Sequence, residues 1–193
     1  MPAMPANPAS TGGLVRTETS LPGVFVLEPR VFHDERGFFF ESYNRQSMAS
    51  VGITAEFVQD NHSSSRQNVL RGLHYQIRQA QGKLVRAVEG EILDVAVDLR
   101  RSSAHFGRWE AVQLSAENKR MLWIPAGFAH GFLVLSGKAD VLYKATDFYA
   151  PAYERTLLWN DAQVNIHWGL KGVPIVSGKD QSGATLSDAE TFE

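Results

Sequence analysis

The sequence predicts an all-β domain with few helices, and three observations support that fold class. Short apolar runs of strand length recur along the chain, and they are rich in β-branched and aromatic residues. Gly, Asn, Asp and Pro separate these runs, as they do in turns between strands. No internal repeat or change of composition divides the 193 residues, so we expect one domain. This pattern is typical of a sandwich, a jelly roll or a closed barrel.

The expected strands follow one another from Leu21 onward. They cover residues 23–29, 37–43, 55–61, 83–90, 91–100, 108–115, 121–125, 131–137, 139–149 and 154–160. Residues 44–52 are the clearest helix candidate, because Asn44 can cap the start and Gly52 can end it. "LSAENKR" is expected to form a turn or a short helix, and the polar chain after Pro174 a short helix or a mobile tail.

Composition excludes several classes of function. The net charge of -2 argues against non-specific nucleic-acid binding, which needs a basic face. The chain has no cysteine, which rules out disulfides and thiolate metal sites. No apolar run approaches the roughly 20 residues of a membrane helix. The opening "MPAMPANPASTGG" has neither the basic start nor the apolar centre of a signal peptide, so we expect a disordered leader and a cytoplasmic protein.

Polar residues in the stretch "NVLRGLHYQIRQAQGKLVRAVEG" are the first functional signal. Arg71, His74 and Lys83 lie there among apolar neighbours, where a purely structural strand needs none of them. Further along, "IPAGFAHGF" places a proline, a glycine and His130 just before an apolar strand. This combination is similar to the two sequence boxes of cupin β-barrels, which bind ligands inside the barrel or at its mouth.

A metal-dependent cupin is the first alternative, and the sequence argues against it. Such a site takes two closely spaced histidines, a carboxylate and a later histidine. Gln76 stands where the second histidine would be, and Lys83, a cation, stands where the carboxylate is expected. His74 and His130 alone do not complete a site, so we expect no metal.

Three side chains suit acid–base chemistry without a metal. Histidine titrates closest to neutral pH of all side chains, so His74 suits proton abstraction. Lys83 offers a positive charge to a developing oxyanion, and Tyr143 offers a hydroxyl that can donate a proton. These groups suffice to deprotonate a carbon next to a ketone and to reprotonate it from the other side. The chain has no GxGxxG or P-loop motif, and we expect no cofactor.

The carboxylate that would orient the base stays open at this point, because a histidine base needs one but spacing does not select it. The candidates are Asp60, Asp94, Asp98, Asp140 and Asp180. The same polar residues also have structural interpretations. His74 and Tyr143 suit a hydrogen-bonded core, and Lys83 suits a solvated surface, as do the arginines at 36, 71 and 86. A non-catalytic sugar-binding module is therefore a second alternative.

Several motifs in a fixed order give a more specific prediction. They are "DERGFFFESYN", "FVQDNHS", "VLRGLHYQ", "QGKLVR", "DVAVDLR", "LSAENKRMLWIPAGFAHGF", "LYKATDFYAP" and "LLWND". Together they resemble the dTDP-4-dehydrorhamnose 3,5-epimerase family over roughly residues 15–180. The resemblance implies a cupin-like jelly-roll β-barrel with a few short helices, a homodimer that exchanges strands, and neither metal nor cofactor. The implied substrate is dTDP-4-dehydro-6-deoxy-D-glucose, inverted at the two carbons flanking its 4-ketone.

The resemblance also assigns catalytic roles. It makes the histidine of "RGLH", His74, the base, and the aspartate of "SGKD", Asp180, its partner. Lys83 of "QGKL" would stabilise the enolate, and Tyr143 of "YK" would be the acid on the opposite face.

Further residues are implied as substrate contacts. They are Arg36, Glu41, Gln59, Asn61, Arg71, His130, Glu154 and Lys179. Arginine and lysine suit a pyrophosphate, and the carboxylate and amide side chains suit a sugar or thymine edge. Phe38 offers a stacking face for a base. In the dimer, Arg36 and Glu41 are expected to come from the partner subunit.

One departure from the family pattern concerns specificity. Phe148 in "ATDFYAP" stands where many members have a second tyrosine. The family also includes relatives that invert only one carbon, so a mono-epimerase of a related dTDP-4-keto sugar is the closest alternative. The expected organisation is a leader at 1–14, the epimerase domain at 15–180 and a tail at 181–193.

Overall fold

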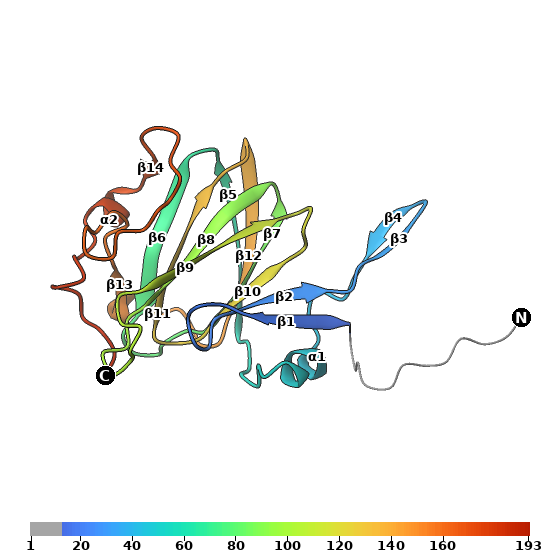
Figure 1. Ribbon diagram of the computed structural model, residues 1–193, viewed down its shortest axis with the longest axis horizontal. Helices are drawn as coiled ribbons and strands as arrows, with labels where there is room; N and C mark the ends of the chain where they lie inside the picture. Colours follow the sequence, from blue (N-terminus) through green and yellow to red (C-terminus); the bar gives the residue numbers. More distant parts are fainter. Residues whose placement is uncertain (1–12) are drawn as a thin grey trace, which may run out of the picture.

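The computed structural model describes residues 13–193 and places most of them in two large sheets (Figure 1). The first sheet has the strand order β1 (Leu14–Glu18), β2 (Phe25–Pro29), β10 (Met121–Ile124), β7 (Lys83–Glu89), β12 (Lys138–Ala145), β5 (Gln59–Arg66). The second has the order β13 (Glu154–Thr156), β6 (Val69–Gln76), β11 (Phe128–Val134), β8 (Glu91–Asp98), β9 (Trp109–Ser115), with β14 (Ile175–Val176) parallel to β6. The remaining elements are the hairpin β3 (Phe32–Asp34) and β4 (Gly37–Phe39), the helices α1 (Arg45–Ser50) and α2 (Gly178–Gln181), and a 3₁₀ turn (Pro151–Tyr153).

The two sheets pack face to face around the main hydrophobic core. Val85 and Val141 come from the first sheet, and Ile92, Phe128 and Phe132 from the second. Because side chains alternate along a strand, every second residue of β7, β8, β11 and β12 points into the space between the sheets. Burying each such side chain stabilises the fold by about 1.5–3 kcal/mol, so the positions between them are held rigidly.

The outer faces of both sheets are covered as well. On the second sheet, Leu73 and Leu133 pack against Trp168 and Leu186 of the C-terminal segment. On the first sheet, α1 contributes Met48 to a separate cluster. Of the two alternatives for the chain after Pro174, the structure forms the short helix, α2, and the residues beyond it pack against the sheet.

The prediction of a mostly-β chain with few short helices is confirmed. Helix α1 begins after Asn44, whose Oδ1 accepts hydrogen bonds from the backbone N–H groups of Gln46 (2.8 Å) and Ser47 (3.3 Å). The predicted closed barrel is wrong. Within residues 13–193 the edge strands β1, β5, β9 and β13 form no ladder with the opposite sheet, so the sheets stack as separate layers.

Strands β1, β3 and β14 were not among the expected strands, and β5 was expected only for residues 59–61. Strand β5 reads "QDNHSSSR" and has little intrinsic β-propensity. It nevertheless pairs with β12 along its whole length, from Ala145↔Gln59 to Lys138↔Arg66. Strand β1 pairs with β2 in the same way. Pairing with a neighbour therefore outweighs local preference at the edges of the first sheet.

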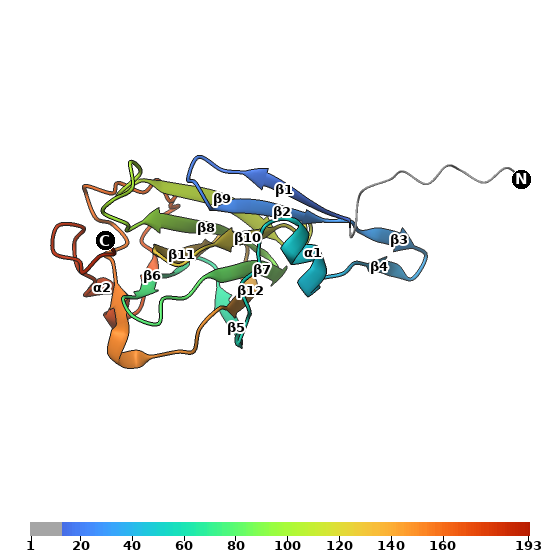
Figure 2. The same ribbon diagram turned by 90° about the horizontal axis from the view of Figure 1, so that it is seen from below.

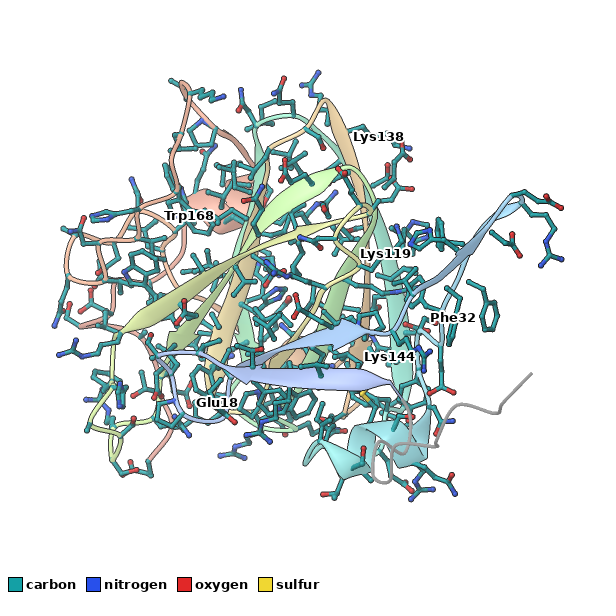
Figure 3. All side chains as sticks on the ribbon, turned by 45° about the vertical axis from the view of Figure 1, so that its right-hand side comes forward. Glu18, Phe32, Lys119, Lys138, Lys144 and Trp168 are labelled. Atoms are coloured by element: carbon teal, nitrogen blue, oxygen red, sulfur yellow. The ribbon has the colours of Figure 1, made fainter. Side chains whose placement is uncertain are left out.

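The hairpin β3–β4 extends away from both sheets, on the side opposite to the C-terminal segment (Figures 1 and 2). Its side chains, including Phe32, stand apart from the dense packing between the sheets (Figure 3). Phe32, Phe38 and Phe39 are all exposed, Phe39 to 72%. Exposed apolar groups of this kind are typical of surfaces that bind another molecule.

Two expectations concern the chain outside the sheets. The leader was predicted at residues 1–14. Residues 1–12 of it lie outside the described part of the chain, and residue 14 is the first residue of β1. None of the helices in residues 13–193 has the length and apolar character needed to cross a bilayer.

Candidate active site

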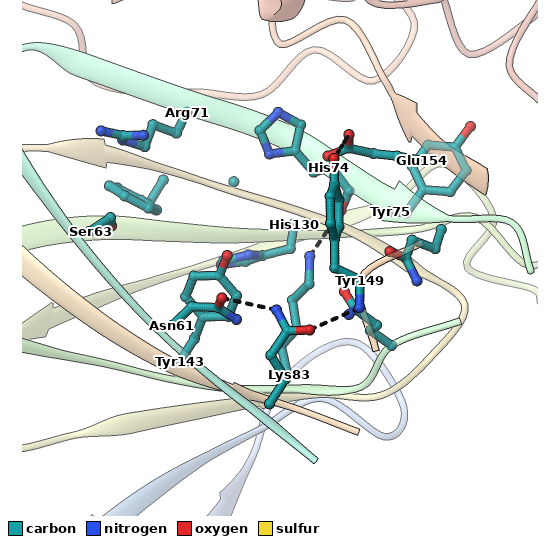
Figure 4. Close-up of a pocket in the computed structure, with 15 residues that line it drawn as sticks. Asn61, Ser63, Arg71, His74, Tyr75, Lys83, His130, Tyr143, Tyr149 and Glu154 are labelled. Carbon is teal, nitrogen blue, oxygen red and sulfur yellow. Dashed lines mark hydrogen bonds between the residues drawn. The ribbon is translucent and has the colours of Figure 1, made fainter. Parts of the chain in front are cut away.

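A polar cavity of about 200 Å³ opens between the two sheets (Figure 4). It brings together most residues predicted from the sequence: Gln59, Asn61, Arg71, His74, Lys83, His130, Tyr143 and Glu154. Asp180 lies behind His74, and Lys179 lies at the rim beside Glu154. The predicted residues therefore converge on one site, with two exceptions described below.

The first sheet supplies Lys83, Tyr143 and Asn61 by simple alternation. Lys83 and Val85 share one face of β7, and Val85 belongs to the core between the sheets. Tyr143 shares a face of β12 with Val141, and Asn61 is its register partner on β5. The hydrophobic residues of each strand thus fix the direction of its polar residue.

In the second sheet, an irregularity in β6 brings Arg71 and His74 to the same cavity. Strict alternation would place residues three apart on opposite faces. The register with β11 shifts between the pairs His130↔His74 and Phe132↔Arg71, so one extra residue is accommodated. Gly72 lies at this point with φ 114°, and a Cβ there would come within 2.7 Å of the His130 carbonyl oxygen. Glycine is therefore required here.

His74 and Asp180 form a hydrogen-bonded imidazole–carboxylate pair, the arrangement that a histidine base needs. Nε2 of His74 donates to Oδ1 of Asp180 at 2.6 Å, which leaves Nδ1 as the basic nitrogen. Asp180 also accepts from the backbone N–H of Gly72 (3.2 Å) and is held on α2, whose Ser177 cap accepts from its N–H. Burial raises the pKa of Asp180, but the hydrogen bonds from His74 and Gly72 outweigh it and lower the pKa below its ordinary value.

Of the five candidate aspartates, Asp180 is the one whose carboxylate contacts His74 in residues 13–193, and each of the others has a different partner. Asp60 pairs with Lys144, Asp94 with His130, Asp98 with Arg100, and Asp140 with His62 and Lys138.

Lys83 is a buried ammonium at the floor of the cavity. Its Nζ donates to the backbone carbonyl of His74 at 3.2 Å. Burial lowers the pKa of Lys83 to about 8, and the charges of Asp94 and Glu154 limit that decrease. The lysine is therefore mostly charged at neutral pH while much of its hydration is removed. That is the condition in which a cation stabilises an oxyanion most strongly.

His130 forms a second histidine–carboxylate pair. Its Nε2 donates to both carboxylate oxygens of Asp94, at 2.8 and 3.0 Å. Burial lowers the pKa of His130, so its imidazole is neutral near pH 7. His130 lines the cavity, whereas Asp94 lies beneath it with no exposed surface.

Tyr143 reaches the cavity from the sheet opposite to His74. Burial raises the pKa of Tyr143, so its hydroxyl keeps its proton at neutral pH and can donate it. A ligand between the two sheets would therefore have the His74 imidazole on one side and the Tyr143 phenol on the other.

The mouth of the cavity carries a linked set of polar groups. Glu154 accepts from Nζ of Lys179 (2.6 Å) and from the hydroxyl of Tyr149 (2.9 Å). Nε2 of Gln59 donates to Oδ1 of Asn61 (2.9 Å), and its Oε1 accepts from the Tyr149 N–H (2.8 Å). These contacts hold the 146–150 loop against the opening.

Arg36 and Glu41 are the two predicted residues that do not reach this cavity. Arg36 lies at the tip of the β3–β4 hairpin, 85% exposed and paired with Asp34 at 2.5 Å. Glu41 accepts hydrogen bonds from Asn44 (3.0 Å) and Ser47 (2.7 Å) beside α1. Neither residue lines the cavity that contains His74.

Other cavity residues were not predicted, although the family motifs contain them. Ser63 ends "FVQDNHS", Gln81 begins "QGKLVR" and Tyr149 lies within "LYKATDFYAP", so each could have been inferred from its motif. Gln76, at the position of a cupin ligand, donates to the carbonyls of Gln79 (2.8 Å) and Phe148 (3.2 Å). It thus fixes the loop at the mouth. Within residues 13–193 no three His, Cys, Asp or Glu side chains gather in a metal-binding group.

An imidazole and a phenol that face each other across a cavity lined by cations form an arrangement suited to an enzyme that moves protons on a polar substrate. Comparison with known proteins specifies the class. A sequence profile of dTDP-4-dehydrorhamnose 3,5-epimerase matches residues 18–188. The dTDP-4-dehydrorhamnose 3,5-epimerase of Pseudomonas aeruginosa is 59% identical over 177 residues, which cover 91% of this chain and 98% of the relative. The chain therefore belongs to the dTDP-4-dehydrorhamnose 3,5-epimerase family.

Solved structures agree with this assignment. dTDP-6-deoxy-D-glucose-3,5-epimerase from Legionella pneumophila, in complex with dTDP-4-keto-L-rhamnose, superposes with a TM-score of 0.88 at 48% identity, covering 90% of this chain and 93% of that one. A 3'-monoepimerase from Streptomyces bikiniensis, in complex with dTDP-quinovose, has a TM-score of 0.83 at 34% identity, covering 88% and 87%. The fold is thus shared by enzymes that invert two carbons and by one that inverts a single carbon.

Proposed function

We propose that this chain converts dTDP-4-dehydro-6-deoxy-D-glucose to dTDP-4-dehydro-L-rhamnose by inverting the two carbons that flank the 4-ketone. The observation that carries the proposal is the placement of His74 and Tyr143 on opposite sheets of one cavity. Inversion requires a proton to leave one face of the sugar and another to arrive at the opposite face. The high identity to named 3,5-epimerases favours two inversions over one.

In the proposed mechanism, His74 removes the proton from the carbon next to the ketone, and Asp180 stabilises the imidazolium that forms. The electron pair of the C–H bond moves to the ketone oxygen and gives an enolate, whose charge Lys83 balances. Tyr143 then delivers its proton to the opposite face of the carbon, and solvent restores both side chains. The same steps at the second carbon complete the reaction without a redox change.

Cations at the mouth suit the nucleotide part of the substrate. Arg71 donates from Nε to Ser65 (2.9 Å) and from Nη2 to the Ser64 carbonyl (3.4 Å), which leaves Nη1 for a phosphate oxygen. Lys179 lies across the opening beside Glu154. We infer that these cations bind the pyrophosphate, and that Gln59, Asn61 and Tyr149 contact the sugar or thymine.

We further propose a cytoplasmic homodimer of jelly-roll subunits, in which the β3–β4 hairpin of each subunit covers the cavity of the other. Support comes from the three exposed phenylalanines of the hairpin and from the distance of Arg36 from its own cavity. Burying such aromatics against a second copy would offset their exposure. Arg36 would then contribute a further cation to the partner's nucleotide site.

Proton NMR in heavy water tests the reaction. The purified protein is incubated with dTDP-4-dehydro-6-deoxy-D-glucose, and the downstream reductase is then added. Deuterium at both carbons with formation of dTDP-L-rhamnose is expected. Label at one carbon only would indicate a mono-epimerase, and no label would indicate a binding protein. In the same assay Tyr143→Phe should exchange protons but fail to invert, and full inversion would refute its role as the acid.

Subunit complementation tests the exchanged hairpin. His74→Ala and Arg36→Ala should each be inactive or weak as homodimers. Mixed after reversible dissociation, they form heterodimers with one intact cavity, so activity should return. Light scattering should give the mass of a dimer. A monomer, or a mixture without regained activity, would contradict the proposed exchange.

A further inference from the structure

Asp94 is a fully buried carboxylate that the proton-transfer steps do not use. It lies on the inner face of β8 between the core residues Ile92 and Ala96, with no exposed surface. Within residues 13–193, the hydrogen bonds to its carboxylate come from Nε2 of His130 alone, at 2.8 and 3.0 Å. Removing a carboxylate from water is strongly unfavourable unless an opposite charge compensates it.

Asp98, four residues further along the same face of β8, shows how such a charge is usually compensated. It is equally buried, and it accepts from Nε (2.9 Å) and Nη2 (2.7 Å) of Arg100 and from Ser103 (2.7 Å). Asp94 has no lysine or arginine within ion-pairing distance in residues 13–193, and its partner is an imidazole that burial keeps neutral. The charge of Asp94 must therefore be balanced from further away.

Lys83 is a buried positive charge that, conversely, needs a negative charge to balance it. Lys83 is 8% exposed, and its ammonium donates to the His74 carbonyl, without a carboxylate within ion-pairing distance in the described chain. Burial lowers the pKa of Lys83 to about 8, and among the surrounding charges Asp94 opposes that decrease most strongly. His130, bonded to Asp94, lines the same cavity as Lys83 (Figure 4).

The other groups around Lys83 do not supply this charge. The titratable and charged groups on the neighbouring elements are Arg71 and His74 on β6, Asp94 on β8, His130 on β11, Tyr143 on β12, Glu154 on β13 and Lys179 on α2. Glu154 and Lys179 pair with each other at 2.6 Å and largely cancel. The Asp180 carboxylate is bonded to His74. Asp94 is left as the unmatched anion.

We propose that Asp94 is a positioning residue that supplies the counter-charge for Lys83, with the neutral imidazole of His130 interposed between them. This inference rests on the proposed role of Lys83 toward the enolate. A direct salt bridge would occupy the ammonium. A counter-charge held one side chain away keeps Lys83 protonated and leaves its N–H groups free for the substrate oxygen.

Asp94→Asn tests the proposal, because asparagine keeps the size and an acceptor for His130 but removes the charge. Lys83 is titrated by NMR in protein carrying ¹³C-labelled lysine, and its signal is assigned with Lys83→Met. The signal should titrate near the value of about 8 in the unsubstituted protein and about one unit lower or more in Asp94→Asn. The alkaline limit of proton exchange should shift by the same amount, with dTDP binding unchanged. Titration at the same pH in both proteins would overturn the proposal.

Asp98→Asn is the matched control on the same strand. Loss of its pair with Arg100 should lower the melting temperature but leave the Lys83 titration where it is. An equal shift of Lys83 in this variant would show a general effect of strain in β8 and would overturn the proposal.

If Asp94→Asn does not fold, a double variant still tests the proposal. Removing the ammonium as well, in Asp94→Asn with Lys83→Met, should then restore folding, because no counter-charge is needed. A double variant that stays unfolded would make Asp94 purely structural and overturn the proposal. The NMR titration requires no substrate, so its result is independent of whether the proposed epimerisation is correct.

Discussion

Two histidine–carboxylate pairs lie side by side in this protein, and they differ in almost everything except composition. His74 and His130 are register partners on β6 and β11. The side chain of His74 is 31% exposed and that of its partner Asp180 4%, whereas His130 is 7% exposed and Asp94 not at all. His74 and Asp180 face the opening of the cavity, whereas His130 and Asp94 are buried at its floor.

The difference shows that burial, more than residue type, decides what such a pair does. His74 has a basic nitrogen accessible to a ligand, so it can accept a proton and return it to water. Burial lowers the pKa of His130 and disfavours its charged form, which makes it a poor base but a stable neutral spacer. Exchanging or removing members of the two pairs should therefore have different consequences.

His74→Ala should have the largest effect on catalysis. Loss of a positioned base costs up to several orders of magnitude, so deuterium exchange at both carbons should fall by at least about 10³-fold. Binding of dTDP, measured by calorimetry, should persist because the cations at the mouth are unchanged. His62→Ala is the control, since His62 forms a similar but exposed pair with Asp140 at 3.2 Å. Exchange comparable to the unsubstituted protein in His74→Ala would refute its role as the base.

Lys83→Met should lower turnover, by less than His74→Ala does, and yet stabilise the fold. The pKa of Lys83 is about 8 in the folded chain, below the ordinary value of 10.5, so folding is penalised whenever the lysine is charged in both states. That penalty is about 3 kcal/mol below pH 8, falls as the pH rises from about 8 to 10.5, and vanishes above. The difference in unfolding free energy between Lys83→Met and the unsubstituted protein should therefore be largest at neutral pH. Denaturant titrations at pH 7 and pH 10 measure it, and a destabilised variant at pH 7 would contradict the buried charge.

Asp180→Asn should have the next largest effect, through orientation rather than through loss of the base. An asparagine side chain cannot stabilise the imidazolium, so exchange should fall by about 10²-fold at neutral pH. The lowered pKa of Asp180 means that its carboxylate stabilises the fold above the unfolded pKa and that this contribution is lost as acid protonates it. Stability should therefore fall less steeply with acid in Asp180→Asn. Unfolding at pH 3 and pH 7 tests this, and identical acid sensitivity would argue against the His74 contact.

Much of the cavity could be predicted from local pattern and motif. Alternation with core residues sets the directions of Lys83 and Tyr143, and both were predicted. The family motifs selected Asp180, which lies 106 residues from His74 in the chain and which spacing alone left among five candidates. Only a three-dimensional fold brings α2 against β6.

What escaped prediction depends on contacts that no local pattern encodes. The irregularity at Gly72 is needed to place Arg71 beside His74, although a strict alternation would separate them. Strand β5 forms because β12 offers a partner, despite its run of serines. The prediction of a closed barrel was wrong. The number of strands predicts a β-fold, but it does not determine whether the edge strands of the two sheets pair with each other to close a barrel.

Phe148→Tyr should have the smallest effect on catalysis. It tests the mouth of the cavity, near the accessible pair of His74 and Asp180. The ring of Phe148 is 61% exposed, while its backbone carbonyl accepts from Gln76 at 3.2 Å. An added hydroxyl would reach solvent, and exposed substitutions usually change free energies by no more than about 0.5 kcal/mol, so kcat/KM should change by less than about threefold. Steady-state kinetics with the coupled reductase measures this, together with the ratio of deuterium at the two carbons. A changed ratio would mean that this position contacts the sugar and that Phe148 sets the balance between the two inversions.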